Sequence, residues 1–178
     1  MAKVTFLGNE INLTGNEVKV GDRAPVVELV DKDLNVVKVG GEESEKGVEI
    51  LVVVPSLDTG VCATETRKFN EKMAGKPNSV VRVISMDLPF ASGRFCATEG
   101  IENVRTLSDF RGAKFGKAYG VLCGDGVLEG LLARAIFGIR NGVVVYKEIV
   151  SKVEEEPNYE AVFEAIKSAG GCGCGCSH

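Results

Sequence analysis

Histidine and tryptophan are the scarcest residues of this 178-residue sequence: tryptophan is absent, and the one histidine is His178, in the last position. Histidine general bases, Ser-His-Asp and Cys-His catalysis, and HExxH zinc sites all need an imidazole held inside the fold. A histidine in the last position does not supply one. Any catalysis must therefore depend on Cys, Asp, Glu, Lys, Arg, Thr or Tyr side chains, or on a bound cofactor.

Long apolar runs and an excess of positive charge are also missing. No apolar stretch approaches the roughly 20 residues that a membrane-spanning helix needs, and the opening residues Met-Ala-Lys-Val-Thr do not resemble a secretory signal peptide. We therefore expect a cytoplasmic protein that makes no membrane contact. The 25 Asp and Glu residues outnumber the 21 Lys and Arg residues, for a formal net charge of −4. That balance argues against nucleic-acid binding.

The order of the predicted elements indicates an α/β fold. Val48 to Val54 is a nearly continuous β-branched run, which is typical of a strand buried on both faces. A second buried strand is predicted at 80–84, and hairpins are predicted at 4–13, 26–39 and 135–149. Helices are predicted at 59–74, 90–99, 107–119 and 159–169. We expect a thioredoxin-like sandwich, with a central mixed sheet flanked by helices and an N-terminal β-hairpin.

The end of the chain differs in composition from the rest. Residues 1–169 are predicted to form one domain, whereas residues 170–178 are rich in Gly and Cys, cannot bury a core, and are predicted to be a flexible tail. This tail contains four soft metal ligands: Cys172, Cys174, Cys176 and His178. Three interpretations stay open, namely metal binding, a tethered reductant that exchanges with a disulfide, and incidental thiols.

Cys62 has the most informative surroundings of the six cysteines. A buried strand ends at Pro55 and a helix is predicted to begin near Thr59, so Cys62 falls in the first helical turn. With Thr59 as the N-cap, Cys62 occupies position N3, where backbone N–H groups lack helical partners and the helix dipole is positive. This position favours a thiolate over a thiol. The alternative interpretation is a small buried hydrophobic side chain.

A helix N-terminus alone contributes about 0.3–1 kcal/mol to a negative charge, which is too little to hold a thiolate at neutral pH. A cation must therefore contribute, and without an internal histidine it must be Arg or Lys. Arg134 is the best candidate, because it is a lone arginine directly before a predicted apolar strand. A charge that enters such a segment is costly unless it is paired.

These residues carry a family resemblance. Pro55, Thr59 and Cys62 match the PxxxTxxC motif of peroxiredoxins, and the string Pro-Ser-Leu-Asp-Thr-Gly-Val-Cys at 55–62 resembles the thiol peroxidase subgroup, the atypical two-cysteine peroxiredoxins. Residues 87–96, Asp-Leu-Pro-Phe-Ala-Ser-Gly-Arg-Phe-Cys, resemble the segment of that subgroup that carries its second cysteine. Ala-Arg-Ala at 133–135 resembles its arginine segment. The resemblance covers residues 4–169 and does not extend into the tail.

The resemblance implies a thioredoxin-dependent peroxidase that reduces hydrogen peroxide and organic hydroperoxides with no cofactor. Cys62 would be the peroxidatic cysteine, which becomes a sulfenic acid, and Cys96 the resolving cysteine, which joins it in an intramolecular disulfide. Thr59 would orient the peroxide and the thiolate. Arg134 would stabilise the thiolate and the leaving oxygen, and Pro55 would limit solvent access. The subgroup's usual assembly is a homodimer.

Other interpretations remain open at this stage. A thioredoxin-like disulfide oxidoreductase is disfavoured because the chain contains no C-x-x-C pair. A metal-binding or redox-sensing module would use the tail cysteines instead. If Cys62 and Cys96 both lie on helices, at least one helix end must unwind to form a disulfide, and Gly60, Gly93 and Gly100 are candidate positions for that movement. Cys123 is interpreted as a packing residue.

Overall fold

The computed structural model describes residues 2–41, 47–72, 79–102 and 104–165. Its strands are β1 (Lys3–Phe6), β2 (Asn9–Thr14), β3 (Val27–Asp31), β4 (Val36–Val39), β5 (Val48–Val53), β6 (Ser79–Ser85), β7 (Arg105–Ser108), β8 (Leu122–Cys123), β9 (Ala135–Arg140) and β10 (Val143–Ile149). Its helices are α2 (Gly60–Lys72), α3 (Pro89–Glu99), α4 (Lys114–Tyr119) and the 3₁₀ helix η1 (Gly126–Leu128), and residues 159–165 are also helical.

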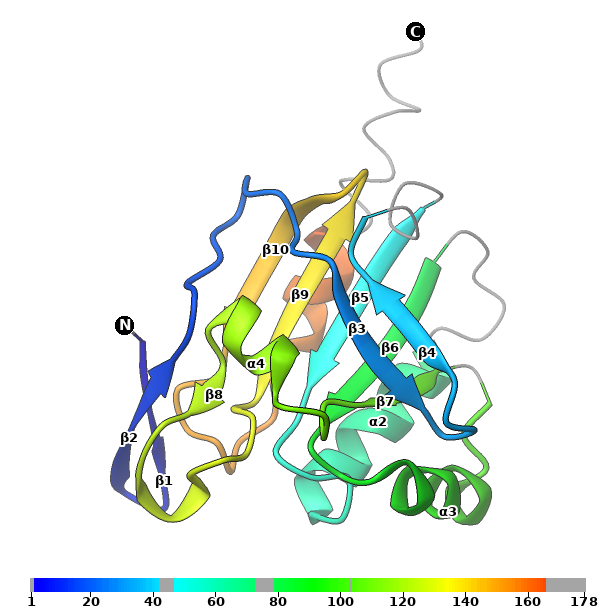
Figure 1. The fold of residues 1–178 in the computed structure, drawn as a ribbon, viewed down its shortest axis with the longest axis horizontal. Helices are drawn as coiled ribbons and strands as arrows, with labels where there is room; N and C mark the ends of the chain where they lie inside the picture. The colour runs from blue at the N-terminus through cyan, green and yellow to red at the C-terminus, as the bar shows by residue number, and fades with distance from the viewer. Residues whose placement is uncertain (1, 42–46, 73–78, 103, 166–178) are drawn as a thin grey trace, which may run out of the picture.

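A mixed central sheet is the framework of the described chain (Figure 1). Its strand order is β10-β9-β5-β6-β7-β3-β4. Strands β5, β6 and β7 run parallel, and the remaining neighbours are antiparallel. Every residue of β5 is buried, as expected for a parallel strand covered on both faces. The thioredoxin-like fold with its mixed sheet and N-terminal hairpin is therefore confirmed.

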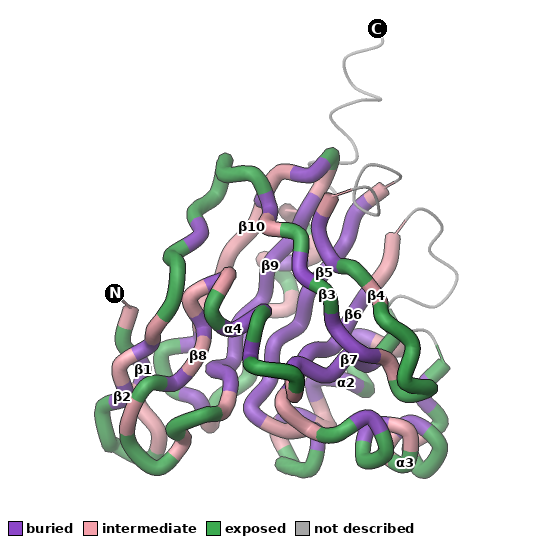
Figure 2. Tube along the Cα trace, in the orientation of Figure 1, coloured by how far each residue is buried: buried purple, intermediate pink, exposed green. Residues whose placement is uncertain are grey.

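The β5 side chains alternate between two hydrophobic cores, one on each face of the sheet. Leu51 and Val53 pack in the core that also contains the α4 side chains Phe115 and Tyr119. The alternate positions of β5 pack in the second core, which contains Cys62 and Phe69 of α2, Cys96 of α3 and Val162. Figure 1 shows α4 in front of the sheet and α2 behind it, and Figure 2 shows the buried strands between them.

The N-terminal hairpin forms a second, smaller sheet with the strand order β1-β2-β8. The predicted hairpins β3-β4 and β9-β10 also form within the central sheet. Asn141 and Gly142 connect β9 to β10 with φ angles of 54° and 75°. Two consecutive positive φ angles are the type I′ geometry that Asn-Gly favours in a two-residue hairpin.

Within the described ranges, the structure corrects the helix predicted at 107–119. Residues 105–108 form β7, which pairs in parallel with β6, and helix α4 covers only 114–119. The chain cannot stay helical between these elements because Gly112 and Ala113 have φ angles of 84° and 52°. The Asp109 carboxylate accepts hydrogen bonds from the N–H groups of Phe115 and Gly116, both at 2.9 Å, and so fixes the start of α4.

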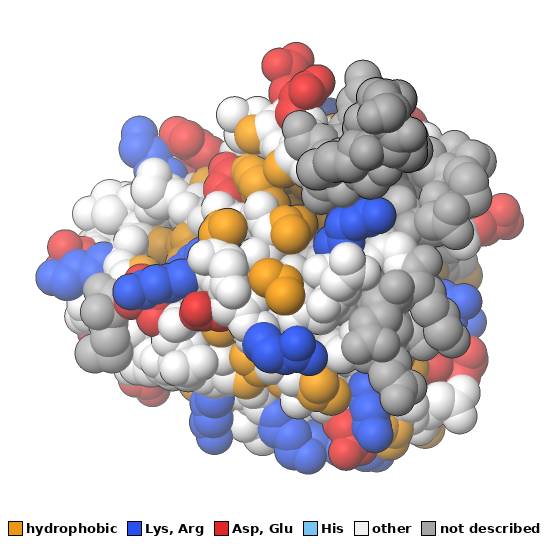
Figure 3. Space-filling model, turned by 90° about the horizontal axis from the view of Figure 1, so that it is seen from above, with side chains coloured by type: hydrophobic (Ala, Val, Ile, Leu, Met, Phe, Trp, Pro, Cys, Tyr) orange, Lys and Arg blue, Asp and Glu red, His pale blue; other side chains and the backbone are white. Residues whose placement is uncertain are grey.

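Two surface properties accompany this fold. None of the helices in the described ranges is both long and apolar enough to cross a membrane. On the face seen in Figure 3, positive and negative side chains are interspersed rather than separated by sign.

Candidate active site

The first turn of α2 places Cys62 shortly after β5, a buried strand of the central sheet. The chain leaves β5 at Val53 and passes through the buried Pro55, and α2 begins at Gly60. The Cys62 N–H donates a hydrogen bond of 3.2 Å to Thr59 Oγ1, so Thr59 is the N-cap, as predicted, and Cys62 is at N3. The Thr59 hydroxyl in turn donates to the Ser56 carbonyl oxygen at 3.4 Å.

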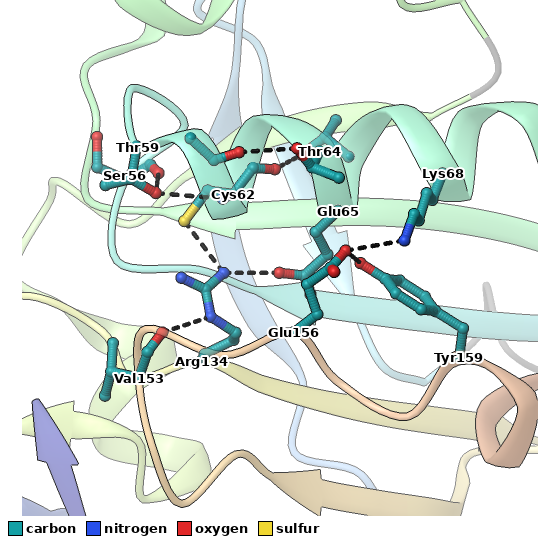
Figure 4. Close-up of polar contacts among 12 residues, drawn as sticks. Ser56, Thr59, Cys62, Thr64, Glu65, Lys68, Arg134, Val153, Glu156 and Tyr159 are labelled. Atoms are coloured by element: carbon teal, nitrogen blue, oxygen red, sulfur yellow. Dashed lines mark hydrogen bonds and ion pairs between the residues drawn. The ribbon is translucent and has the colours of Figure 1, made fainter.

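Arg134 provides the cation beside Cys62. Its side chain is 2% exposed, and its Nη1 lies 3.1 Å from Cys62 Sγ and 2.7 Å from Glu65 Oε2 (Figure 4). Its Nε donates to the Val153 carbonyl oxygen at 2.8 Å, which fixes the plane of the guanidinium. Burial lowers the pKa of Arg134, but Cys62 and Glu65 more than offset this and raise it above its ordinary value. The guanidinium therefore stays charged inside the protein.

Glu65 is the site residue that sequence reasoning missed. Its side chain is 0% exposed. Burial raises its pKa to about 7, although the charge of Arg134 and its hydrogen bond act in the opposite direction. A signal for it was present, because Glu65 lies three residues after Cys62 and four before Phe69, on the face of α2 that enters the core. A glutamate on such a face requires a buried partner.

A second group of polar side chains holds α2 against the segment that follows β10. Glu156 Oε1 accepts hydrogen bonds from Lys68 Nζ at 3.0 Å and from the Tyr159 hydroxyl at 2.8 Å (Figure 4). The Lys68 ammonium also lies 4.8 Å from the centre of the Tyr159 ring. These hydrogen bonds lower the pKa of Glu156. Its negative charge contributes to the raised pKa of Glu65.

Cys96 lies on the neighbouring helix α3, in the same core as Cys62. It is 8% exposed, and its Sγ is 3.7 Å from Thr106 Oγ1 on β7. Cys62, Cys96 and Cys123 are all free thiols. Cys123 is 1% exposed and packs in the core on the opposite face of the sheet, which confirms it as a packing residue. The structure thus brings Thr59 and Arg134 into contact with Cys62 and places Cys96 on the adjacent helix. Pro55 is buried in the connection between β5 and α2.

The tail residues proposed as metal ligands lie outside the described part of the chain: Cys172, Cys174, Cys176 and His178. Within the described ranges, no group of three or more His, Cys, Asp or Glu side chains could hold a metal ion.

Comparison with known proteins places this chain in a family. Residues 19–163 match the Redoxin family model. The chain is 51% identical over 177 residues to the thiol peroxidase of Campylobacter jejuni, covering 98% of this chain and 99% of that one. It is 51% identical to the thiol peroxidase of Aquifex aeolicus over 92% of this chain and 96% of that one.

Solved structures agree with this relationship. A peroxiredoxin-like protein from Aquifex aeolicus superposes with a TM-score of 0.90 at 49% identity, covering 94% of this chain and 97% of that chain. A thiol peroxidase from Chromobacterium violaceum shares the fold, with a TM-score of 0.84 at 24% identity, covering 94% of this chain and 96% of that chain. The chain therefore belongs to the thiol peroxidase family of peroxiredoxins.

Proposed function

We propose that this thiol peroxidase reduces hydrogen peroxide and organic hydroperoxides through a sulfenic acid at Cys62. The observation that carries the proposal is the contact of 3.1 Å between Arg134 Nη1 and Cys62 Sγ. It brings a buried, charged guanidinium against the one described cysteine that lies in the first turn of a helix. Both features stabilise a thiolate, which is the nucleophilic form of cysteine.

The first chemical step transfers one oxygen atom to sulfur. The Cys62 thiolate attacks one peroxide oxygen, an S–O bond forms, and the O–O bond breaks. The leaving alkoxide or hydroxide takes up a proton, and Cys62 becomes a sulfenic acid. Arg134 is placed to stabilise the negative charge on sulfur before the step and on the leaving oxygen during it. The Thr59 hydroxyl orients the reactants, and the buried Pro55 limits solvent access to the thiolate.

In the second step, the Cys96 thiol attacks the sulfenic acid sulfur, an S–S bond forms and water leaves. A disulfide requires Cα atoms within about 7 Å of each other. Because Cys62 and Cys96 lie on separate helices and are both buried, the step needs a helix end to unwind. Gly60 opens α2, and Gly100 closes α3 in a left-handed conformation with φ of 65°. These two ends, with Gly93 inside α3, are the positions where we expect the movement.

The disulfide must then accept two electrons from an external dithiol. Thioredoxin is the proposed reductant, a homodimer the proposed assembly and the cytoplasm the proposed location. The family resemblance supports the first two. The alternative of a metal-binding or redox-sensing module depends on the residues after 169, and no feature of the described chain favours it.

Peroxide consumption by two single variants tests this proposal. Cys62→Ser should consume no peroxide above the uncatalysed rate, because serine is not ionised at neutral pH. With thioredoxin as the reductant, Cys96→Ser should complete one turnover and then stop, because its sulfenic acid has no resolving partner. A small external thiol should restore its peroxide consumption. Mass spectrometry of the wild type after stoichiometric peroxide should find a Cys62–Cys96 disulfide. Undiminished turnover by Cys62→Ser would overturn the proposal.

A further inference from the structure

Asp87 connects the segment that precedes the helix of Cys62 to the segment that precedes the helix of Cys96. It lies between β6 and α3, and its carboxylate accepts hydrogen bonds from the Ser56 hydroxyl at 2.8 Å and from the Leu57 N–H at 2.7 Å. Ser56 and Leu57 belong to the connection between β5 and α2. Hydrogen bonds to a carboxylate are among the stronger ones in proteins.

These hydrogen bonds continue from Asp87 to the backbone of Cys62. The Ser56 carbonyl oxygen accepts the hydrogen bond of the Thr59 hydroxyl, and the Thr59 oxygen accepts the hydrogen bond of the Cys62 N–H. The Ser56 hydroxyl oxygen also accepts the Asp58 N–H at 3.2 Å. The carboxylate therefore fixes Ser56, and Ser56 fixes the residue that caps α2.

Asp87 is itself held by the ends of two strands of the central sheet. The Ser85 hydroxyl donates to its Oδ2 at 2.9 Å and accepts its N–H at 3.2 Å. The Ser108 hydroxyl, at the end of β7, donates to its carbonyl oxygen. Helix α3 begins two residues later, at Pro89. The Asp87 side chain thus links the segment before α2 to the segment before α3, and Asp87 is itself held by Ser85 and Ser108, the last residues of β6 and β7.

We propose that Asp87 is a positioning residue that stabilises the ordered form of residues 56–59, and that its hydrogen bonds to Ser56 and Leu57 break when the Cys62–Cys96 disulfide forms. This inference rests on the proposed function. The ordered form presents the capped Cys62 to peroxide, and of the two helix ends that could unwind for disulfide formation, the start of α2 is the one that Asp87 holds. Weakening the anchor should therefore slow the attack on peroxide and speed the resolution of the sulfenic acid.

The competition between two fates of the sulfenic acid measures this balance. Cys96 converts it to a disulfide with loss of water, whereas a second peroxide molecule oxidises it to a sulfinic acid and is itself reduced to water. If the start of α2 is the helix end that moves, resolution follows this movement, whereas a sulfenic acid held in the ordered form stays available to the second peroxide. The ratio of disulfide to sulfinic acid at fixed excess peroxide therefore reports how readily residues 56–59 leave the ordered form.

Asp87→Asn removes the charge with little change in shape, and it places an amide N–H₂ where one oxygen accepted hydrogen bonds. Asp109→Asn is the matched control, because Asp109 also follows a strand of the central sheet and accepts two backbone hydrogen bonds, but it holds α4 and neither cysteine helix. Each protein is mixed with excess hydrogen peroxide without reductant, and mass spectrometry quantifies both products at Cys62. Peroxide consumption in the first turnover gives the rate of attack.

Asp87→Asn should raise the ratio of disulfide to sulfinic acid about tenfold and lower the first-turnover rate, and Asp109→Asn should leave both within about twofold of the wild type. An unchanged or lower ratio in folded Asp87→Asn overturns the inference. If Asp87→Asn does not fold, Ser56→Ala takes its place, and the ratio of disulfide to sulfinic acid should rise about threefold. An unchanged ratio in Ser56→Ala would also overturn the inference. A wild type that forms neither product shows instead that the proposed function has failed.

Discussion

Cys62 and Cys123 are equally buried cysteines in unlike surroundings. Their exposed fractions are 0% and 1%, and they pack in the cores on opposite faces of the sheet. Burial, together with the charge of Asp125, raises the pKa of the Cys123 thiol to about 11. Cys62 has instead a helix N-terminus and the Arg134 guanidinium beside its sulfur. Burial by itself therefore favours the neutral thiol, and a thiolate needs neighbouring positive charge.

Cys96 adds a third environment to this comparison. Its polar neighbour is the Thr106 hydroxyl, which is uncharged and lies 3.7 Å from the sulfur. In the proposed cycle Cys96 attacks the sulfenic acid after a helix end has unwound, so it does not require a pre-formed cation site. The three environments suit a nucleophile toward peroxide, a resolving thiol and a packing residue, respectively.

Removing the cation should have the largest effect on this contrast. Arg134→Met is expected to lower the second-order rate constant for hydrogen peroxide about 100- to 1,000-fold, because both the thiolate and the leaving oxygen lose their charged partner. Stopped-flow peroxide consumption measures the rate constant. Arg140→Met, at the other end of β9, is the control and should stay within about threefold of the wild type. Equal rate constants for the two variants would contradict the assigned role of Arg134.

A smaller, pH-dependent effect is expected from Glu65. Its pKa is raised from 4.5 to about 7 by burial, so the folded state binds more protons than the unfolded state between these values. The contribution of Glu65 to the free energy of unfolding is therefore fully present below about pH 4.5 and is lost as the pH rises toward 7, by roughly 2–3 kcal/mol. Glu65→Gln should flatten this pH dependence, as measured by urea unfolding across that range.

The matched control for Glu65 is Glu155→Gln, because Glu155 is 59% exposed and pairs with Lys152 at the surface. It should leave the pH dependence as it is in the wild type, since exposed ion pairs contribute little to the free energy of unfolding. A Glu65→Gln protein with the same pH dependence as the wild type would show that Glu65 titrates as an ordinary carboxyl group.

The smallest effect is expected from the cysteine on the other face of the sheet. Cys123→Ala should leave the rate constant for peroxide within about twofold of the wild type and should lower the free energy of unfolding by about 1 kcal/mol, through lost packing alone. Peroxide kinetics and urea unfolding of the same sample measure both quantities. A tenfold slower reaction would mean that Cys123 takes part in turnover.

Local sequence patterns predicted the parts of the site that depend on adjacent residues. The β-branched run at 48–54 predicted the buried strand, and the spacing of Thr59 and Cys62 predicted a capped helix with sulfur at its start. The position of Arg134 before an apolar strand predicted a buried charge that needs a partner. The structure places Cys62 Sγ against this charge. Each of these inferences could be made from one short segment, without knowing which distant residues it contacts.

Features that depend on distant segments were not predicted. Leu107 falls in a segment predicted to be helical because the signal of a four-residue strand is short, and its pairing with Ile84 of β6 is a tertiary contact. Glu65 has a residue type common on exposed helix faces, and its ion pair forms with a residue 69 positions away. The hydrogen bonds of Asp87 likewise join segments 30 and 31 positions apart. The partners in such pairings are set by the packed fold. The spacing of Glu65 from Cys62 and Phe69 indicates that Glu65 faces the core, but no local pattern identifies Arg134 as its partner.

The charge state of Cys62 tests the central claim most directly. The difference in ultraviolet thiolate absorbance between the wild type and Cys62→Ser isolates this one sulfur, and it is recorded against pH with and without the Arg134→Met change. We predict that the difference is already present at neutral pH and that Arg134→Met removes it there. Ordinary cysteines ionise at about pH 8.5. A difference that appears only above about that pH, both with and without Arg134→Met, would contradict the central claim.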